Sequence, residues 1–308
     1  MGVPKVVYIG GHGRSGTTIT DRVLSEVLGA FSAGEVHRFW EYGLGRDWTC
    51  SCGAPLRKCT FWSEVLRQSF SEFGCSEEDI LKAWKTVARP KSIFALQYPT
   101  LRSTRFQRRL SRYRSFLRTF YESVSQKSKK EVIVDSSGSP LHGYVLSGIR
   151  NVDMAMLHVV RDARAVAYSN RKDKINPSRR GSGARMQKKS TVRVALTWLY
   201  YNKMFESLKD KFNFGITKKY EELYSSPKSE FKNTAGKLGF QGRIMDVFKG
   251  DDKIFLNKGH NGQGNPIRYK SGNIKLEKDV KWERELSRTR KIVASLISYK
   301  GLKKYRYE

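Results

Sequence analysis

A glycine-rich loop follows the first apolar run and is the stretch of this chain best suited to binding an anion. Residues 10–21 read GGHGRSGTTITD, directly after KVVYI. The pattern G-x-x-x-x-G-K-[ST] cradles phosphate between a strand and a helix, whose free N–H groups point at the anion. Gly11 and Gly16 fill its glycine positions, but Thr17 replaces the lysine and Arg14 lies three residues earlier. Because arginine is a bidentate anion ligand, Arg14, backbone N–H groups and threonine hydroxyls could hold a phosphate without lysine or metal.

Alternating strands and helices are predicted around this loop. Apolar runs indicate strands, and apolar spacings of three and four residues indicate helices. Strands are expected at residues 5–10, 131–135, 154–160 and 214–220, and helices at 17–29, 61–88 with a break near Gly74, 102–126, 191–209 and 277–299. Strands that are apolar throughout are typical of a parallel sheet covered on both faces. The sequence therefore predicts a single domain over residues 1–308, a P-loop-like three-layer α/β fold with a central parallel sheet flanked by helices.

The chain is strongly basic, which bears on its partners rather than on its fold. Its 308 residues include 59 Lys and Arg against 29 Asp and Glu, a net charge of +30. Anionic substrates, membrane surfaces and nucleic acid would all be attracted to such a charge. No run of about 18 apolar residues predicts a membrane span, and no signal peptide or myristoylation pattern is visible. We expect a cytoplasmic protein, with contact to a membrane surface and the oligomeric state left open.

Two segments resemble the donor-binding motifs of sulfotransferases, which use 3′-phosphoadenosine 5′-phosphosulfate (PAPS). G-x-x-R-S-G-T-T after a first strand is similar to their 5′-phosphosulfate loop, which implies binding by Gly13, Arg14, Ser15, Gly16, Thr17 and Thr18. Residues 161–169, RDARAVAYS, resemble the family pattern R-D-P-R-x-x-x-x-S, with Ala163 in place of proline. This second match implies that Arg161 and Ser169 grip the 3′-phosphate. The end of a strand and the following helix flank the usual ligand crevice of open α/β sheets.

A third segment resembles bacterial members of the family, in particular the carbohydrate-type branch. Residues 259–269, GHNGQGNPIRY, are similar to their H-x-x-x-G-N-P-x-R. The resemblance implies that Gly264, Asn265 and Arg268 close over the adenosine and the 3′-phosphate. Weaker similarities occur in GEVHRFWEYG, CSCGAPLRKCTFW, VDSSGSP, YEELYSSP and the final KW-x-x-x-L, so that the resemblance extends from residue 5 to about residue 300.

The resemblance implies a sulfotransferase that moves a sulfuryl group from PAPS to a hydroxyl or amine by in-line displacement, without a metal. Arg14 would stabilise the charge of the transferring group. Glu35 is the expected base, because tyrosylprotein sulfotransferases have a glutamate after a glycine at a similar distance from the loop arginine. His37 and His12 are alternative bases, and His142 and His158 are weaker ones. The basic surface favours an anionic or carbohydrate-containing acceptor, such as a glycan, a glycolipid or a small alcohol, but the sequence does not identify it.

Three features of the sequence depart from the family pattern or stay open. In VDSSGSP, Gly138 stands where the bacterial branch has a lysine. Either another cation, from Arg14 or from residues 171–190, serves the bridging oxygen, or the enzyme is impaired or altered. Residues 171–190 carry eight basic side chains against one acid and are predicted to form a mobile lid for an anionic acceptor. The spacing of Cys50, Cys52 and Cys59 fits the usual zinc patterns poorly, and we interpret them as reduced, buried thiols, with a metal site or a disulfide as alternatives.

Two other functions compete with this interpretation. A P-loop kinase would need a metal-binding aspartate at the end of a strand, a role that Asp135 could take, although the missing lysine argues against it. A nucleic-acid-binding protein is favoured by the charge and by seven arginines within residues 102–118. No recognised nucleic-acid module occurs in the sequence, so we expect no specific nucleic-acid partner.

Overall fold

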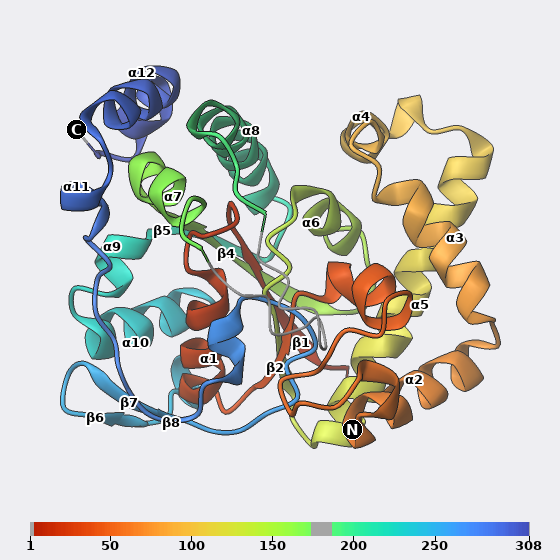
Figure 1. Cartoon of the computed structure of the whole chain (residues 1–308). Helices are drawn as coiled ribbons and strands as arrows, with labels where there is room; N and C mark the ends of the chain where they lie inside the picture. The colour runs from red at the N-terminus through yellow and green to blue at the C-terminus, as the bar shows by residue number, and fades with distance from the viewer. Residues whose placement is uncertain (1–2, 174–186, 308) are drawn as a thin grey trace.

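The computed structural model describes residues 3–173 and 187–307 and places the glycine loop directly after the middle strand of a parallel sheet (Figure 1). The sheet has five strands in the order β2-β3-β1-β4-β5, and all neighbouring strands are parallel. The strands are β1 (Lys5–Gly10), β2 (Phe31–Gly34), β3 (Val132–Asp135), β4 (Asp153–Val160) and β5 (Phe214–Lys219). The predicted α/β fold with a central parallel sheet is confirmed. Most of the predicted basic lid, residues 174–186, lies outside the described residues.

Helices cover both faces of the sheet, because successive side chains of a strand point to opposite sides. Val7 and Ile9 of β1 pack in one core with α1 and α10, whereas Val6 and Tyr8 pack in a second core with α2, α5, α6 and α8. The helices are α1 (Thr17–Val27), α2 (Thr60–Phe73), α3 (Glu77–Val87), α4 (Ser92–Gln97), α5 (Thr104–Ser128), α6 (Pro140–Leu146), α7 (Ala163–Ser169), α8 (Thr191–Lys209), α9 (Tyr220–Leu223), α10 (Pro227–Lys237), α11 (Trp282–Glu285) and α12 (Arg288–Lys304). Burial on both faces explains why the strands read as uninterrupted apolar runs.

Among the described residues, no helix is long and apolar enough to cross a membrane. Short helical turns connect the strands and helices. The turns are η1 (Val36–Arg38), η2 (Phe39–Leu44), η3 (Leu56–Lys58), η4 (Pro99–Leu101), η5 (Gln241–Arg243) and η6 (Pro266–Tyr269).

Two parts of the fold differ from the sequence prediction. A small antiparallel sheet of β6 (Phe248–Lys249), β7 (Lys253–Leu256) and β8 (Gly272–Lys275) was not expected, and neither was β2. The helix predicted for residues 277–299 begins too early: residues 277–281 are not helical, and the rest of the range falls in α11 and α12. Tertiary contacts hold this stretch instead, since Leu276 N–H donates to Asp252 O at 2.7 Å and the Asp279 carbonyl accepts from Arg161 at 2.9 Å.

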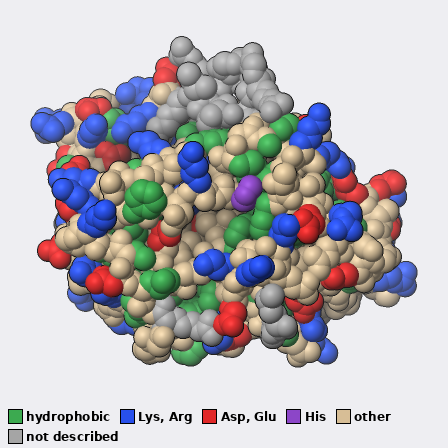
Figure 2. All heavy atoms as spheres, turned by 90° about the horizontal axis from the view of Figure 1, so that it is seen from below, with side chains coloured by type: hydrophobic (Ala, Val, Ile, Leu, Met, Phe, Trp, Pro, Cys, Tyr) green, Lys and Arg blue, Asp and Glu red, His purple; other side chains and the backbone are tan. Residues whose placement is uncertain are grey.

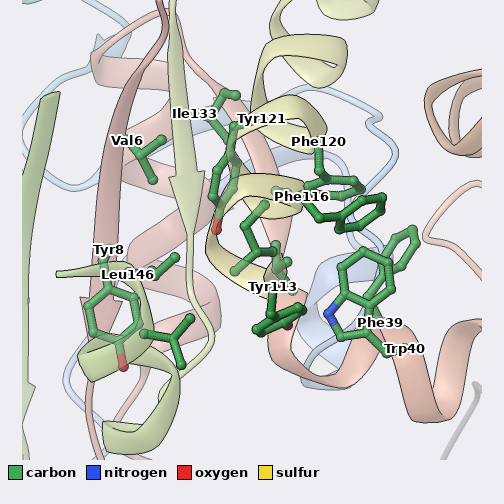
Figure 3. Close-up of a cluster of buried hydrophobic side chains, with 14 of the residues drawn as sticks. Val6, Tyr8, Phe39, Trp40, Tyr113, Phe116, Phe120, Tyr121, Ile133 and Leu146 are labelled. Carbon is green, nitrogen blue, oxygen red and sulfur yellow. The ribbon is translucent and has the colours of Figure 1, made fainter. Parts of the chain in front are cut away.

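The larger core is built from aromatic side chains between the sheet and α5 (Figure 3). Phe39 and Trp40 of η2 meet Phe116 and Phe120 of α5, and all four side chains have no solvent exposure. The ring of Trp62 stacks on Phe120 with centroids 6.0 Å apart. Edge-to-face contacts join Phe39 and Trp40 to Phe120 at 5.6 and 5.4 Å, within the range where aromatic pairs add to burial. This cluster fixes the segment that follows β2, and with it Glu35.

Truncation of Phe120 should therefore destabilise the protein strongly. We expect Phe120→Ala to lower the free energy of unfolding by about 3–5 kcal/mol, since it removes a large ring and leaves a cavity. Phe94→Ala in α4 is the matched control, because its side chain is 61% exposed. Urea unfolding followed by circular dichroism measures both variants, and equal losses of stability would contradict the assignment of this core.

Candidate functional site

The glycine loop is shaped by close packing of its backbone against neighbouring strands and helices. Gly16 caps the N-terminus of α1 with a φ of 92°, and a Cβ there would lie 2.7 Å from the ring of Tyr220. A Cβ at Gly11 would lie 2.7 Å from the carbonyl oxygen of Val159. Both predicted glycine positions thus require glycine, one for its conformation and both for space. The loop turns tightly within this space, since Ser15 N–H donates to His12 O at 3.0 Å.

The sheet topology places this loop at a point where connections leave on opposite faces. The helix after β1, α1, packs on one face, whereas α6, which follows the neighbouring strand β3, packs on the other. Crevices at the carboxyl ends of such strands are the usual ligand sites of open α/β sheets. Here the crevice holds a cavity of about 390 Å³. The predicted site residues that line it are Gly13, Arg14, Gly16, Thr17, Thr18, Glu35, Arg161, Ser169, Gly264 and Asn265. Segments far apart in the sequence therefore meet at one cavity.

Two predicted residues, Ser15 and Arg268, do not line this cavity. The Ser15 side chain is buried beneath the loop, and its hydroxyl has no hydrogen-bond partner among the described residues. Arg268 is 1% exposed, and its guanidinium donates to the carbonyl oxygens of Gly262 at 2.7 Å and of Thr49 at 2.8 Å. The guanidinium of Arg268 thus lies behind the 259–269 segment in this structure, where it is engaged with backbone carbonyls.

Arg161 lies at the end of β4 and is fixed by contacts on several sides. Its guanidinium stacks over the ring of Tyr220, 4.4 Å from the centroid, and donates to the carbonyl oxygen of Arg14 at 3.2 Å. It also pairs with the carboxylate of Asp279 at 3.3 Å, and Lys172 approaches the same carboxylate at 3.5 Å. Asp279 therefore supplies a negative charge between two cations at the wall of the cavity.

Glu35 lies at the cavity in a group of positive side chains. Its carboxylate pairs with Arg38 at 2.9 Å, and this charge raises the pKa of Arg38. Burial lowers the pKa of Arg14, an effect that Glu35 opposes and Arg38 reinforces. The pKa of Lys189 is lowered by burial and by the charges of Arg38, Arg193 and Arg14. Five cations and three acids line this cavity, and the excess of positive charge favours an anionic ligand.

The alternative histidine bases are held away from the cavity, which no histidine of the described residues lines. Burial lowers the pKa of His12 to about 4, and its Nε2 lies 3.0 Å from the Thr197 hydroxyl. His158 has its pKa lowered to about 4 by burial and lies 2.9 Å from Asn202. Burial also lowers the pKa of His37. A neutral imidazole can still accept a proton, and His37 and His142 line a neighbouring cavity.

Asp135, the aspartate that a kinase would need for its metal, is fully buried and occupied. One carboxylate oxygen accepts from the Tyr121 hydroxyl at 2.6 Å and lies 3.0 Å from His142 Nε2. The other accepts from the backbone N–H of Ser137 at 2.9 Å and from its hydroxyl. With both oxygens engaged away from the cavity, this carboxylate is poorly placed to hold a magnesium ion beside the loop.

A second cavity, of about 280 Å³, adjoins the first and shares Arg38 with it. Its walls include the aromatic side chains of Tyr42, Trp84 and Tyr113 and the imidazoles of His37 and His142. The two cavities differ in their charged lining, since five cations line the first and only Arg38 lines the second. Arg38, which pairs with Glu35 of the first cavity, is the residue that lines both cavities.

Sequence reasoning missed several cavity residues. Arg38, Lys270, Lys275 and Tyr220 line the first cavity but belong to no motif that we singled out for donor binding, although Arg38 lies three residues after Glu35 in GEVHRFW. Gly138 has a φ of 56°, and a Cβ there would lie 3.1 Å from the carbonyl oxygen of Gly11. A lysine at this position would therefore be strained.

The arginines of α5 are largely engaged with the protein itself. Arg114 donates to the carbonyl oxygens of Val145 and Tyr144, both at 2.9 Å, and Arg118 pairs with Glu122 at 2.9 Å. Figure 2 shows Lys and Arg side chains distributed over one face among acidic and neutral ones. On this face, the arrangement gives little support to a continuous nucleic-acid-binding band.

Away from the cavity, Cys50, Cys52, Cys59 and His260 come together, with their four possible ligand atoms within 4.8 Å of one another. The sequence could not show this cluster, because His260 lies 201 residues after Cys59. Three thiols and an imidazole are a ligand set for a soft metal ion. The expectation of a metal-free protein is therefore in doubt at this place.

The fold is similar to that of two solved sulfotransferase domains. The sulfotransferase domain from the Synechococcus PCC 7002 olefin synthase is 15% identical, with a TM-score of 0.44 over 97% of this chain and 96% of that one. The sulfotransferase domain from the curacin biosynthetic pathway is 14% identical, with a TM-score of 0.45 over 97% of this chain and 99% of that one. Similarity at this level carries no inference about activity. No family model matches the chain, and no curated protein matches it in sequence.

Proposed function

We propose that this protein is a sulfotransferase that uses PAPS as donor. The observation that carries the proposal is the convergence of Arg14, Arg161 and the N-terminus of α1 on one cavity of about 390 Å³. A donor with phosphates at both its 5′ and 3′ positions needs two separate anion sites in one cleft. The loop and α1 offer one such site, and Arg161 with Ser169 offers the other.

The residues at the cavity suit such a nucleotide in detail. Gly11 and Gly16 let the loop backbone pack closely against Val159 and Tyr220, whereas Gly13 lines the cavity and a Cβ there would meet open space, so that a phosphate can approach the loop at Gly13. The Thr18 hydroxyl accepts from Asn265 N–H at 3.3 Å, which links the loop helix to the 259–269 segment across the cavity. Asn265 and Gly264 would cover the nucleoside in this arrangement.

The transfer step is an in-line displacement in which the residues of this chain hold charge and move one proton. The donor supplies a sulfuryl group, whose sulfur gains a bond to the acceptor oxygen as its bond to the phosphate oxygen breaks. Glu35 takes the proton of the acceptor hydroxyl, and Arg38 orients its carboxylate through their 2.9 Å ion pair. Arg14 and the N–H groups at the start of α1 stabilise the charge that builds on the leaving oxygen.

The acceptor would enter through the second cavity, which meets the first at Arg38. Its aromatic walls, with Trp84, Tyr42 and Tyr113, suit a molecule with a flat or weakly polar face, such as a sugar ring. The cationic side chains at the junction favour an acceptor that also carries a negative charge. These features support an acidic glycan or glycolipid.

Donor binding should depend on Arg14. Isothermal titration of the full chain with 3′-phosphoadenosine 5′-phosphate, with and without magnesium, should give micromolar, magnesium-independent binding. Arg14→Ala should weaken it on the order of 10- to 100-fold, the value of a charge-assisted hydrogen bond. Arg105→Ala, an exposed change of the same charge on α5, should leave the affinity unchanged. Absence of binding would contradict the proposal, and magnesium-dependent binding of ATP instead would favour a kinase.

The base should be separable from donor binding. Glu35→Gln should lower the turnover number by roughly 10²–10⁴-fold, because amide nitrogen and oxygen cannot take the acceptor proton, while the affinity for 3′-phosphoadenosine 5′-phosphate stays within about 3-fold. Sulfate transfer from PAPS to a panel of glycans, glycolipids and alcohols, read by mass spectrometry, provides the rate. Glu78→Gln, an exposed change on α3, is the control. Unchanged turnover in Glu35→Gln would eliminate Glu35 as the base.

Asp279 should compete with the donor, since its carboxylate already pairs with Arg161 and Lys172 at the wall of the cavity. We expect Asp279→Asn to tighten binding of 3′-phosphoadenosine 5′-phosphate by roughly 5-fold. The reason is that the ligand no longer has to displace the carboxylate from Arg161, an ion pair that contributes about 1 kcal/mol. Asp251→Asn in the β6–β7 turn removes the same charge elsewhere and should have no effect. Calorimetry decides: weaker binding in Asp279→Asn would mean that this carboxylate positions Arg161 for the ligand.

A further inference from the structure

Three cysteines from one loop and a histidine from a distant segment meet beside the part of the chain that carries Gly264 and Asn265. Cys50 and Cys52 lie in a turn, Cys59 precedes α2, and His260 begins the 259–269 segment. Their Sγ and ring nitrogen atoms all lie within 4.8 Å of one another. None of the four takes part in the transfer reaction proposed above, so the cluster needs a separate explanation.

The distances within the cluster are those of ligands around a small tetrahedral ion. Zinc–sulfur bonds of about 2.3 Å and zinc–nitrogen bonds of about 2.0 Å place two sulfurs about 3.8 Å apart and a sulfur and a nitrogen about 3.5 Å apart. Cys52 Sγ lies 3.7 Å from Cys59 Sγ. His260 Nδ1 lies 3.2 Å from Cys59 Sγ and 3.9 Å from Cys50 Sγ. A disulfide, in contrast, needs sulfurs at about 2.05 Å, and all three cysteines are free thiols.

The backbone around the cysteines orients them toward one point. Gly53, with a φ of 91°, permits a tight turn in which Gly53 N–H donates to Cys50 O and Cys50 N–H donates to Ala54 O, both at 2.9 Å. This turn presents the side chains of Cys50 and Cys52 together. Cys59 is the N-cap residue of α2, where the helix dipole favours a thiolate.

His260 is fixed as firmly as the cysteines. Its carbonyl oxygen accepts from the indole N–H of Trp62 at 2.6 Å, and its ring stacks on Phe61 with centroids 5.3 Å apart and an interplanar angle of 17°. Both aromatic residues belong to the first turn of α2, directly after Cys59. Outer contacts that fix the ring orientation of a histidine are a regular feature of metal sites.

We propose that Cys50, Cys52, Cys59 and His260 bind one zinc ion in a closed, four-coordinate site. Three thiolates and one neutral imidazole complete a tetrahedron, which leaves no position for a substrate and makes the ion structural. The complex has a net charge of about −1, since three thiolates outweigh the divalent ion. The guanidinium of Arg268 donates to the carbonyl oxygen of Thr49, the residue before Cys50, at 2.8 Å. Arg268 therefore places a positive charge next to the negatively charged metal site.

The ion would brace two segments that are otherwise joined by hydrogen bonds. Ser51 N–H donates to Asn261 O at 3.0 Å, Asn261 N–H donates back to the Ser51 hydroxyl at 2.8 Å, and that hydroxyl donates to Gly259 O at 2.7 Å. These hydrogen bonds join the same two segments that carry the four ligands, the loop of residues 49–59 and the 259–269 segment. Coordination would hold the 259–269 segment against the loop of residues 49–59 without help from its few apolar side chains.

Metal analysis of the full chain, purified under reducing conditions, tests this site. We expect about one zinc per chain in the wild type and in Cys75→Ser, whose thiol lies outside the cluster. Cys52→Ser and His260→Gln should lose the ion, and Cys52 is exposed, so that its substitution leaves packing intact. Chelation should lower the melting temperature of the wild type, and added zinc should restore it.

Cobalt titration of the chelated wild-type protein decides the matter even where a variant fails to fold. Tetrahedral thiolate coordination gives a strong charge-transfer band and intense visible bands that saturate at about one cobalt per chain. Absence of these bands together with absence of zinc would overturn the proposal. So would a Cys52–Cys59 disulfide in unreduced, alkylated protein prepared with zinc. Neither result would touch the donor-binding proposal, which the calorimetric titration addresses separately.

Discussion

The constraint on which this structure depends is the cost of placing several guanidinium groups inside one protein domain. A buried charge is tolerated only where hydrogen bonds and opposite charges replace its water. In this structure, backbone carbonyl oxygens accept many of the hydrogen bonds that replace this water. Arg22 donates to the carbonyls of Arg268 at 2.8 Å and Asn257 at 2.6 Å, and Arg161 donates to those of Arg14 and Asp279. Each arginine therefore fixes a stretch of irregular backbone, and those stretches form the cavity wall.

This role of arginine separates residues that resemble one another in sequence. Arg161 and Arg268 were both expected to bind the donor from the resemblance alone. Arg161 lines the cavity because it ends a strand at the carboxyl edge of the sheet. Arg268 lies in the short turn η6 and points behind it, where carbonyls of the 259–269 segment and of Thr49 surround the guanidinium. A motif specifies that an arginine is needed, but the tertiary contacts decide whether it binds a ligand or the backbone that presents one.

The fold was predictable where local pattern and burial agree. β1 and α8 begin and end where the sequence indicates, because apolar continuity and helical spacing are strong there. β2 was missed because its four residues, FSAG, are small or half-exposed and lie at the edge of the sheet. The late start of the last helices was missed because bonds of residues 276–279 to Asp252 and Arg161, distant in sequence, override the helical pattern there. The second cavity and the cysteine–histidine cluster were invisible for the same reason, since both depend on contacts between distant segments.

The same segment connects the cavity and the cysteine cluster, and this explains why an irregular stretch can be positioned accurately. Residues 259–269 contain little apolar side chain to bury, so packing alone would hold them weakly. Gly34 of β2 has a φ of 79° and lets Asn261 approach closely. A Cβ at Gly34 would lie only 2.2 Å from the side-chain oxygen of Asn261. Asn261 also donates to the Ser32 hydroxyl at 2.8 Å, while His260 is held at α2. The contacts of His260 and Asn261 thus hold one end of the segment and those of Arg268 with the Thr49 carbonyl hold the other, so that Gly264 and Asn265 are fixed between them, beside the N-terminus of α1.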